Sequence, residues 1–202
     1  MIIRLETAYL PPLSYVRWWL SSEQLVLEAH ENYQKGGYRN RTLILGANGP
    51  LRLTIPLVKG KNQAQPIREV RIDNNKAWQR QHWQSIRSAY GKAPYFEHYA
   101  DLFEPHYRRP FDFLFDFNLA LLQTLARVLR SPAPTPSDGY HCPGDQLDLR
   151  NRLRPNRPLP DALAPRPYPQ VFGDRFAFVP RLGVLDALFC GAPIEKAPLP
   201  VG

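Results

Sequence analysis

Cysteine is scarce in this sequence, whose 202 residues include only Cys142 and Cys190. Two cysteines are too few for a disulfide framework or a four-cysteine zinc site. We therefore expect reduced thiols and, with them, a cytoplasmic protein. A cysteine nucleophile stays open as a minor alternative, because Cys142 follows His141 and Cys190 follows an apolar stretch.

Long hydrophobic runs and familiar catalytic motifs are also missing. No apolar stretch approaches the ~20 residues of a membrane-spanning helix, and no secretory signal is visible at the start. The phosphate-binding loop, the dinucleotide glycine motif, HExxH, CxxC and GxSxG do not occur, which argues against the enzyme classes built on them. The five histidines are too scattered for a local metal cluster, so we predict no metal site, and the sequence indicates no particular cofactor.

Basic residues, by contrast, are abundant and unevenly placed. The chain has 26 Lys and Arg against 18 Asp and Glu, a net charge of +8. Residues 35–92 alone hold 12 basic and 2 acidic residues, a net of +10. Such a concentration is typical of a surface that binds phosphate, a nucleotide or nucleic acid, whereas a merely solvated basic face is the alternative.

Proline is the second excess, with 22 residues, about twice the usual ~5%. Many of the prolines lie in 131–170, where they disfavour regular structure. A long irregular stretch inside a domain usually forms a functional loop or a lid, or is disordered. We expect a loop, because ordered patterns resume after it.

The remaining patterns predict a single α+β domain over 1–202, with a mixed, mostly antiparallel sheet and three or more packed helices. The clearest hairpin has Asn48-Gly49 at its turn. Strands are expected near 2–6, 24–28, 42–46, 51–58, 67–73 and 175–179. Helices are expected over 13–20, 76–90, 95–107, 111–130 and 184–189.

Two groups of residues suggest binding or acid–base chemistry. Glu28 and Glu31 close a predicted strand shortly before Arg39 and Arg41, so they could form a clamp for a carboxylate or phosphate, or simply an Arg–Glu pair. His82 lies on the predicted helix 76–90, where an acid holding its ring would make it a general base. The alternative is a buried histidine of the core, which is the commoner situation.

Two further groups lie towards the end of the chain. Residues 148–157 place four arginines in a short loop, which could close on an anion or remain an exposed basic loop. Asp186 lies inside an apolar run, so it is either a surface charge of a helix or a buried acid that needs a partner.

The order of these pieces resembles the WbqC-like family. The resemblance spans nearly the whole chain and is carried by an ordered set of short motifs. These are Tyr9-Leu-Pro-Pro12, Glu31-Asn-Tyr33, Tyr38-Arg-Asn-Arg41, Ala47-Asn-Gly49 running into Leu53-Thr-Ile-Pro56, Trp78 with His82 and Ser85-Ile86, Tyr90 with Ala93-Pro-Tyr-Phe96, Asp148-Leu-Arg150 and Gly183-Val-Leu-Asp-Ala-Leu-Phe189. One departure is that other branches of the family carry Gln-Pro before the tyrosine and Asp where Glu31 stands.

The resemblance implies a bacterial protein of surface-polysaccharide (O-antigen) synthesis that modifies an amino sugar, by acyl or aminoacyl transfer. Combined with the basic segment, it predicts a cytoplasmic transferase acting on an anionic, nucleotide- or carrier-linked substrate. His82 would be the general base, oriented by Glu31 or Asp186. The predicted substrate-binding residues are Tyr9, Arg39, Asn40, Arg41 and Lys76. The competing hypothesis is a non-enzymatic protein whose basic 35–92 surface binds nucleic acid or an acidic partner.

Overall fold

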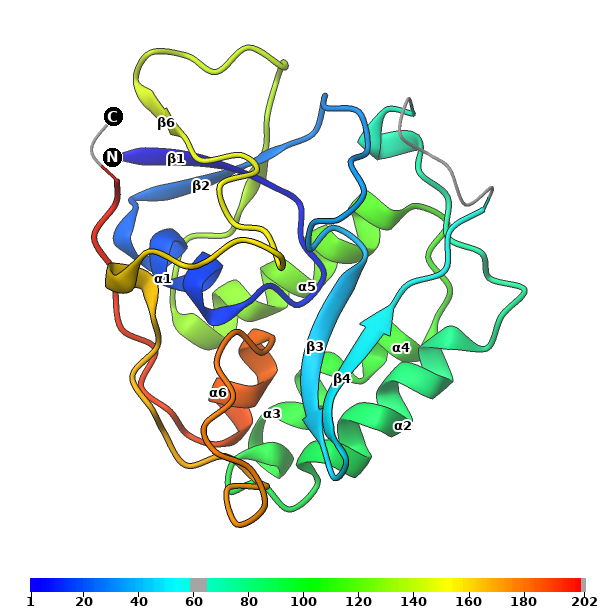
Figure 1. Ribbon diagram of the computed structural model, residues 1–202. Helices are drawn as coiled ribbons and strands as arrows, with labels where there is room; N and C mark the ends of the chain where they lie inside the picture. Colours follow the sequence, from blue (N-terminus) through cyan, green and yellow to red (C-terminus); the bar gives the residue numbers. More distant parts are fainter. Residues whose placement is uncertain (59–64, 201–202) are drawn as a thin grey trace.

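The computed structural model describes residues 1–58 and 65–200. Two sheets form within these ranges, one of four strands and one of two, and the helices pack around them (Figure 1). The strands are β1 (Ile2–Glu6), β2 (Gln24–Glu28), β3 (Arg41–Gly46), β4 (Gly49–Thr54), β5 (Thr135–Pro136) and β6 (Gln146–Asp148). The helices are α1 (Leu13–Ser21), α2 (Trp78–Tyr90), α3 (Phe96–Phe103), α4 (Pro105–Arg108), α5 (Leu114–Leu129) and α6 (Val184–Phe189).

The larger sheet is parallel and has the strand order β5-β2-β1-β6. Its two central strands, β1 and β2, are apolar along most of their length and almost fully buried. Strands covered on both faces have this character, whereas half-exposed antiparallel strands alternate. Helix α1 connects β1 to β2, which makes the three elements one strand–helix–strand unit with parallel strands.

The expectation of a mixed, mostly antiparallel sheet was therefore wrong, although the α+β class was right. The order strand, helix, strand over residues 2–28 already required a crossover, and a crossover places two strands parallel. This signal was present in the sequence. The antiparallel pairing is confined to the separate hairpin β3–β4.

The hairpin formed where the sequence predicted it. Gly46 pairs with Gly49 across Ala47 and Asn48, and Gly49 takes a positive φ of 106°, which glycine adopts without steric cost. The second strand ends at Thr54, before Pro56, because proline has no N–H to donate to a sheet. The hairpin packs against α2 and α6.

The helices lie close to their expected positions. Helix α5 is buried along most of its length, as its nearly continuous apolar sequence predicted. The helix expected over 95–107 is divided into α3 and α4 at Pro105, which occupies the first position of α4. Among the described residues, no helix is both long and apolar enough to cross a membrane.

Three stretches differ from the expectation. Residues 67–73 form a 3₁₀ turn at Ile67–Glu69 followed by isolated bridges, and residues 175–179 form no strand. An alternating pattern becomes a strand only where another strand is available to pair with it. Conversely, the proline-rich stretch 131–170 supplies β5 and β6, the two edges of the parallel sheet. Edge strands tolerate proline because one side of their backbone needs no partner.

Candidate functional site

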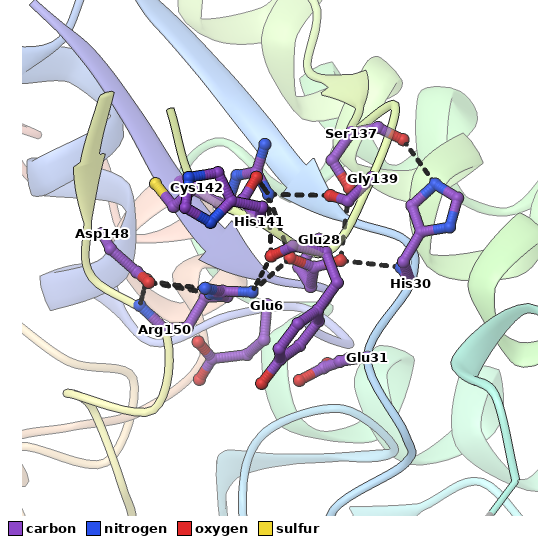
Figure 2. Close-up of polar contacts among 12 residues, drawn as sticks. Glu6, Glu28, His30, Glu31, Ser137, Gly139, His141, Cys142, Asp148 and Arg150 are labelled. Carbon is purple, nitrogen blue, oxygen red and sulfur yellow. Dashed lines mark hydrogen bonds and ion pairs between the residues drawn. The ribbon is translucent and has the colours of Figure 1, made fainter. Parts of the chain in front are cut away.

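The carboxyl ends of the parallel strands gather an unusual number of charged side chains. β1 ends at Glu6 and β2 at Glu28, and both glutamates are buried. β6 leads into Arg150, which lies between Asp148 and Glu28 (Figure 2). In open sheets with parallel strands, ligands generally bind beyond this edge.

Glu28 is the centre of one charged network at this edge. Its carboxylate accepts hydrogen bonds from the backbone N–H of His30 (2.7 Å) and the Ser137 hydroxyl (3.2 Å) on one oxygen. Its other oxygen pairs with Arg4 (3.3 Å) and Arg150 (2.5 Å). We call these five residues the Glu28 network. Its acceptors and donors are already matched to each other, which is the mark of a structural clamp.

The Glu28 network fastens the proline-rich segment to the sheet. Arg4 also donates to the backbone carbonyls of Gly139, Tyr140 and His141, and Arg150 donates to that of Tyr140. The segment therefore follows a defined path although its sequence has few features of regular structure. This is why β5 and β6 can join the sheet.

A second buried group lies next to the first and joins Glu31 to Arg39. The guanidinium of Arg39 donates two hydrogen bonds to the carboxylate of Glu31, at 2.7 and 2.5 Å, and a third to Asn151 Oδ1, at 3.0 Å. The backbone N–H of Asn151 in turn donates to Glu6. Burial raises the pKa of Glu6, while the positive charge of Arg39 opposes that rise. The Arg–Glu pair left open by the sequence is therefore present.

A basic cleft lies beside this pair, between the segment that follows β2 and the end of β4. Its volume is about 330 Å³. Three cations line it, Lys35, Arg41 and Arg52, and no carboxylate is among its described lining residues. Its other lining residues are Tyr33, Gly36, Asn40, Thr54, Ile55, Pro56 and Leu57. We call this hollow the basic cleft.

Tyr33 connects the basic cleft to the buried pair beneath it. Its side chain lines the cleft and is almost fully buried. Burial raises the pKa of the Tyr33 hydroxyl, and the charges of Arg39 and Arg41 act against that rise, so the hydroxyl lies near both guanidiniums. Arg39, and with it its partner Glu31, thus lies close to Tyr33, a lining residue of the cleft.

His82 contacts the cleft lining through the backbone of Thr54. The ring Nδ1 lies 2.9 Å from the Tyr9 hydroxyl, which lies 2.9 Å from the hydroxyl of Tyr107. The backbone of Thr54, a lining residue of the basic cleft, also hydrogen-bonds the imidazole. Burial lowers the pKa of His82 to about 4, so the ring is neutral at pH 7. Tyr9 and Thr54, not Glu31 or Asp186, are thus the partners that orient His82.

Two predicted site residues lie apart from the basic cleft. Lys76 is exposed and its nearest acidic partner is Asp73, at 3.9 Å. Asp186 is completely buried and accepts hydrogen bonds from Tyr168 (2.7 Å) and Gln170 (2.9 Å). Its partners are thus neutral, and burial raises the pKa of its carboxyl.

Neither cysteine is activated by its surroundings. Burial raises the pKa of Cys190 to about 12 and also raises that of Cys142. A thiolate is the nucleophilic form of cysteine, so both side chains are in the unreactive state at neutral pH. Within residues 1–58 and 65–200, no three His, Cys, Asp or Glu side chains are grouped so as to hold a metal ion.

Comparison with known proteins tests the family resemblance. The model of the WbqC-like protein family matches residues 7–141, about two thirds of the chain. This chain belongs to the WbqC-like protein family. Neither the curated proteins nor the solved structures contain a match, so no relative assigns a reaction to it.

In this WbqC-like chain, the structure brings together several of the predicted site residues. Asn40 and Arg41 line the basic cleft, Arg39 lies under it with Glu31, and Tyr9 contacts His82 behind it. Sequence reasoning did not single out Lys35, Arg52 and Tyr33 as ligand-binding residues. The dense basic charge of 35–92 was the signal that pointed to this region, but only the hairpin geometry decides which cations share a cleft.

Proposed function

We propose that this WbqC-like protein binds a phosphate-bearing amino sugar in the basic cleft and transfers an acyl or aminoacyl group to it. The observation that carries the proposal is the convergence of Lys35, Arg41 and Arg52 on one cleft, with no carboxylate among the described lining residues. Cations gathered without a counter-charge favour an anionic ligand, and arginine suits phosphate because its planar fork binds two oxygens. Family membership supports an amino sugar of bacterial surface polysaccharide as the substrate class.

The proposed reaction forms a bond between the sugar nitrogen and the acyl carbon of the donor. The bond from that carbon to the donor's leaving sulfur or oxygen breaks, and the amine loses a proton to a base. His82 is our proposed base, because its ring is neutral at pH 7 and Thr54, its backbone partner, lines the cleft. A ring with a pKa of about 4 is a weak base, so the proposal requires substrate binding to raise that pKa towards neutral pH. Tyr9 and the backbone of Thr54 hydrogen-bond the ring of His82 in this structure. The proposal therefore requires one of these two partners to move when substrate binds.

The binding part is tested by calorimetric titration with a nucleotide-linked amino sugar and with inorganic phosphate. We expect Arg52→Ala and Lys35→Ala each to weaken binding by about 10-fold, since a charge-assisted hydrogen bond contributes roughly 1.5–3 kcal/mol. Arg87→Ala is the matched control, because Arg87 is exposed on α2 and outside the cleft lining. Unchanged binding in both cleft variants would show that the cleft is not the anion site.

The catalytic part is tested by mass spectrometry of the sugar after incubation with thioester and aminoacyl donors. His82→Gln should lower the transfer rate by about 100-fold or more at saturating sugar if the ring is the base. Tyr107→Phe is its control, because it removes a hydroxyl of the same buried chain without touching the ring. Equal rates in wild type and His82→Gln would rule out the base.

The competing hypothesis is a binding protein for nucleic acid. Its distinguishing result is affinity for single-stranded oligonucleotides that falls steeply with salt. Oligonucleotide binding stronger than binding of the nucleotide-linked sugar, and unaffected by the two cleft variants, would favour that hypothesis over ours.

A further inference from the structure

Two groups of arginines in this protein differ in their partners. Arg4, Arg39 and Arg150 are each paired with at least one carboxylate at the carboxyl end of the parallel sheet. Partly buried guanidiniums of the second group surround the segment that follows β2, and in the described parts of the chain they pair with no acid. These are Arg41, Arg154 and Arg181.

The second group is held in place by neutral oxygens alone. Arg41 donates to the backbone carbonyl of Gly37 (2.9 Å), and Arg154 donates to Oε1 of Gln34 (3.1 Å). Arg181 donates to the backbone carbonyl of Arg154 (2.6 Å), which links these two arginines directly. A guanidinium carries five N–H donors, so most donors of this group remain available.

Arg41 also connects this group to the basic cleft. Its charge acts on Tyr33, which lines the cleft, and on Tyr38, whose hydroxyl lies against Arg181. Arg41 lines the cleft with Lys35 and Arg52, and Gln34, which accepts a hydrogen bond from Arg154, directly precedes Lys35 in the chain. Removing cations from water without an opposite charge is costly, so a group of this kind is built for an anion that arrives with the ligand.

Resting on the proposed function, we propose that Arg154 and Arg181 form a second anion position next to the basic cleft, so that the substrate binds through two adjacent phosphoryl groups. One phosphoryl group would lie among Lys35, Arg41 and Arg52, and the other among Arg41, Arg154 and Arg181. A diphosphate linker, as in a nucleoside diphosphate sugar, has two phosphoryl groups close enough to share one arginine. A sugar monophosphate would fill only the first position.

The two arginines of the second position come from the C-terminal part of the chain. Arg154 and Arg181 lie after residue 141, beyond the part of the chain that matches the family model. The C-terminal chain reaches the segment after β2 through Asn151, which bonds Arg39, and Arg154, which bonds Gln34. The part of the chain that matches the family model therefore supplies the basic cleft, and the C-terminal part supplies the two arginines of the proposed second position.

The test compares binding of inorganic pyrophosphate and inorganic phosphate by calorimetric titration. Wild type should bind pyrophosphate about 10-fold or more tightly than phosphate, because the second anion adds charge-assisted hydrogen bonds. The double variant Arg154→Gln/Arg181→Gln should lose that preference and keep its affinity for phosphate. The matched control is Arg157→Gln, an exposed arginine of the same loop.

A measurement on the wild type covers the case in which the double variant does not fold. Hydrogen–deuterium exchange should show that pyrophosphate, but not phosphate, protects residues 150–157 and the chain around 181. Equal affinity for the two probes, or a preference that survives in the folded double variant, would refute the second position and leave the proposed cleft intact. If neither phosphate nor pyrophosphate binds the wild type, the proposed function itself is wrong.

Discussion

At the scale of single residues, burial determines what each polar group can do. His82 and Asp186 were grouped by the sequence as parts of one catalytic set, but the folded chain gives each a different set of neutral partners. Glu31 has the cationic partner Arg39, with which it forms a bidentate ion pair. Residue type alone therefore did not indicate which of these residues are partners.

His82 should also make stability depend on pH. Its pKa is about 4 in the folded protein, compared with 6.5 for an ordinary histidine. As pH falls from 6.5 towards 4, the unfolded chain takes up a proton that the folded chain does not. The contribution of the neutral His82 ring to the free energy of unfolding is therefore fully present above pH 6.5. It decreases as the pH falls below 6.5, by at most about 3 kcal/mol.

Urea unfolding of wild type and His82→Gln at pH 7.5, 6 and 5 checks this expectation. The free energy of unfolding of the wild type should fall with acidity relative to the variant, over the window between 6.5 and 4. His98→Gln serves as the control, because His98 is exposed on α3. A constant difference between wild type and His82→Gln at every pH would show that the ring does not titrate as described.

At the scale of elements, the Glu28 network explains how a proline-rich segment becomes ordered. The backbone of this segment makes only short ladders with β1 and β2, so its position depends on side chains of the sheet, chiefly Arg4 and Glu28. A buried carboxylate that holds two guanidiniums is costly to remove, since both charges lose their partner in a dry environment.

Glu28→Gln should therefore destabilise the protein by about 3 kcal/mol and loosen the segment 137–150. Hydrogen–deuterium exchange in that segment should rise, and trypsin should cleave after Arg150 and Arg152 under native conditions, since Arg154 and Arg157 are each followed by proline. Glu23→Gln is a suitable control, because Glu23 lies just before β2, is exposed and pairs with the N-terminal amine. Exchange and cleavage equal to wild type would mean that the backbone ladders alone hold the segment.

At the scale of the whole molecule, the chain beyond the family match is part of the same core. Leu149, Leu163, Val184 and Phe189 are almost completely buried in the cluster that also contains Tyr9, Trp19 and Phe117. β6 covers one edge of β1, and Gly183 bonds the backbone of Leu43 in the hairpin. The C-terminal third thus packs into one core with the family region.

A chain that ends at residue 141 should consequently fail to reach the native state. The loss of several fully buried apolar side chains removes roughly 1.5–3 kcal/mol each, which together is comparable with the typical 5–15 kcal/mol stability of a domain. Near-ultraviolet circular dichroism should show no fixed aromatic environment. Mixing fragments 1–141 and 142–202 should restore the signal, whereas a native spectrum from 1–141 alone would contradict the prediction.

The sequence alone determined the features that depend on neighbouring residues. The apolar patterns of α1, α2, α5 and α6, and the glycine-containing turn of the β3–β4 hairpin, are local, and each formed close to its predicted place. The excess of positive charge over 35–92 likewise pointed to the region of the basic cleft, because charge density is a property of composition. The strand–helix–strand order over residues 2–28 also favoured parallel strands, in contrast to the mostly antiparallel sheet that was predicted.

Only the tertiary structure decided which distant segments meet. The strand pattern at 175–179 found no partner, while the proline-rich 131–170 supplied two strands, because pairing depends on what the rest of the chain brings alongside. The same holds for the site: Arg154 and Arg181 lie more than a hundred residues from Arg41, and no local pattern encodes their approach to it. The packing of distant segments therefore decides which arginines lie near one another and which of them have a carboxylate as a partner.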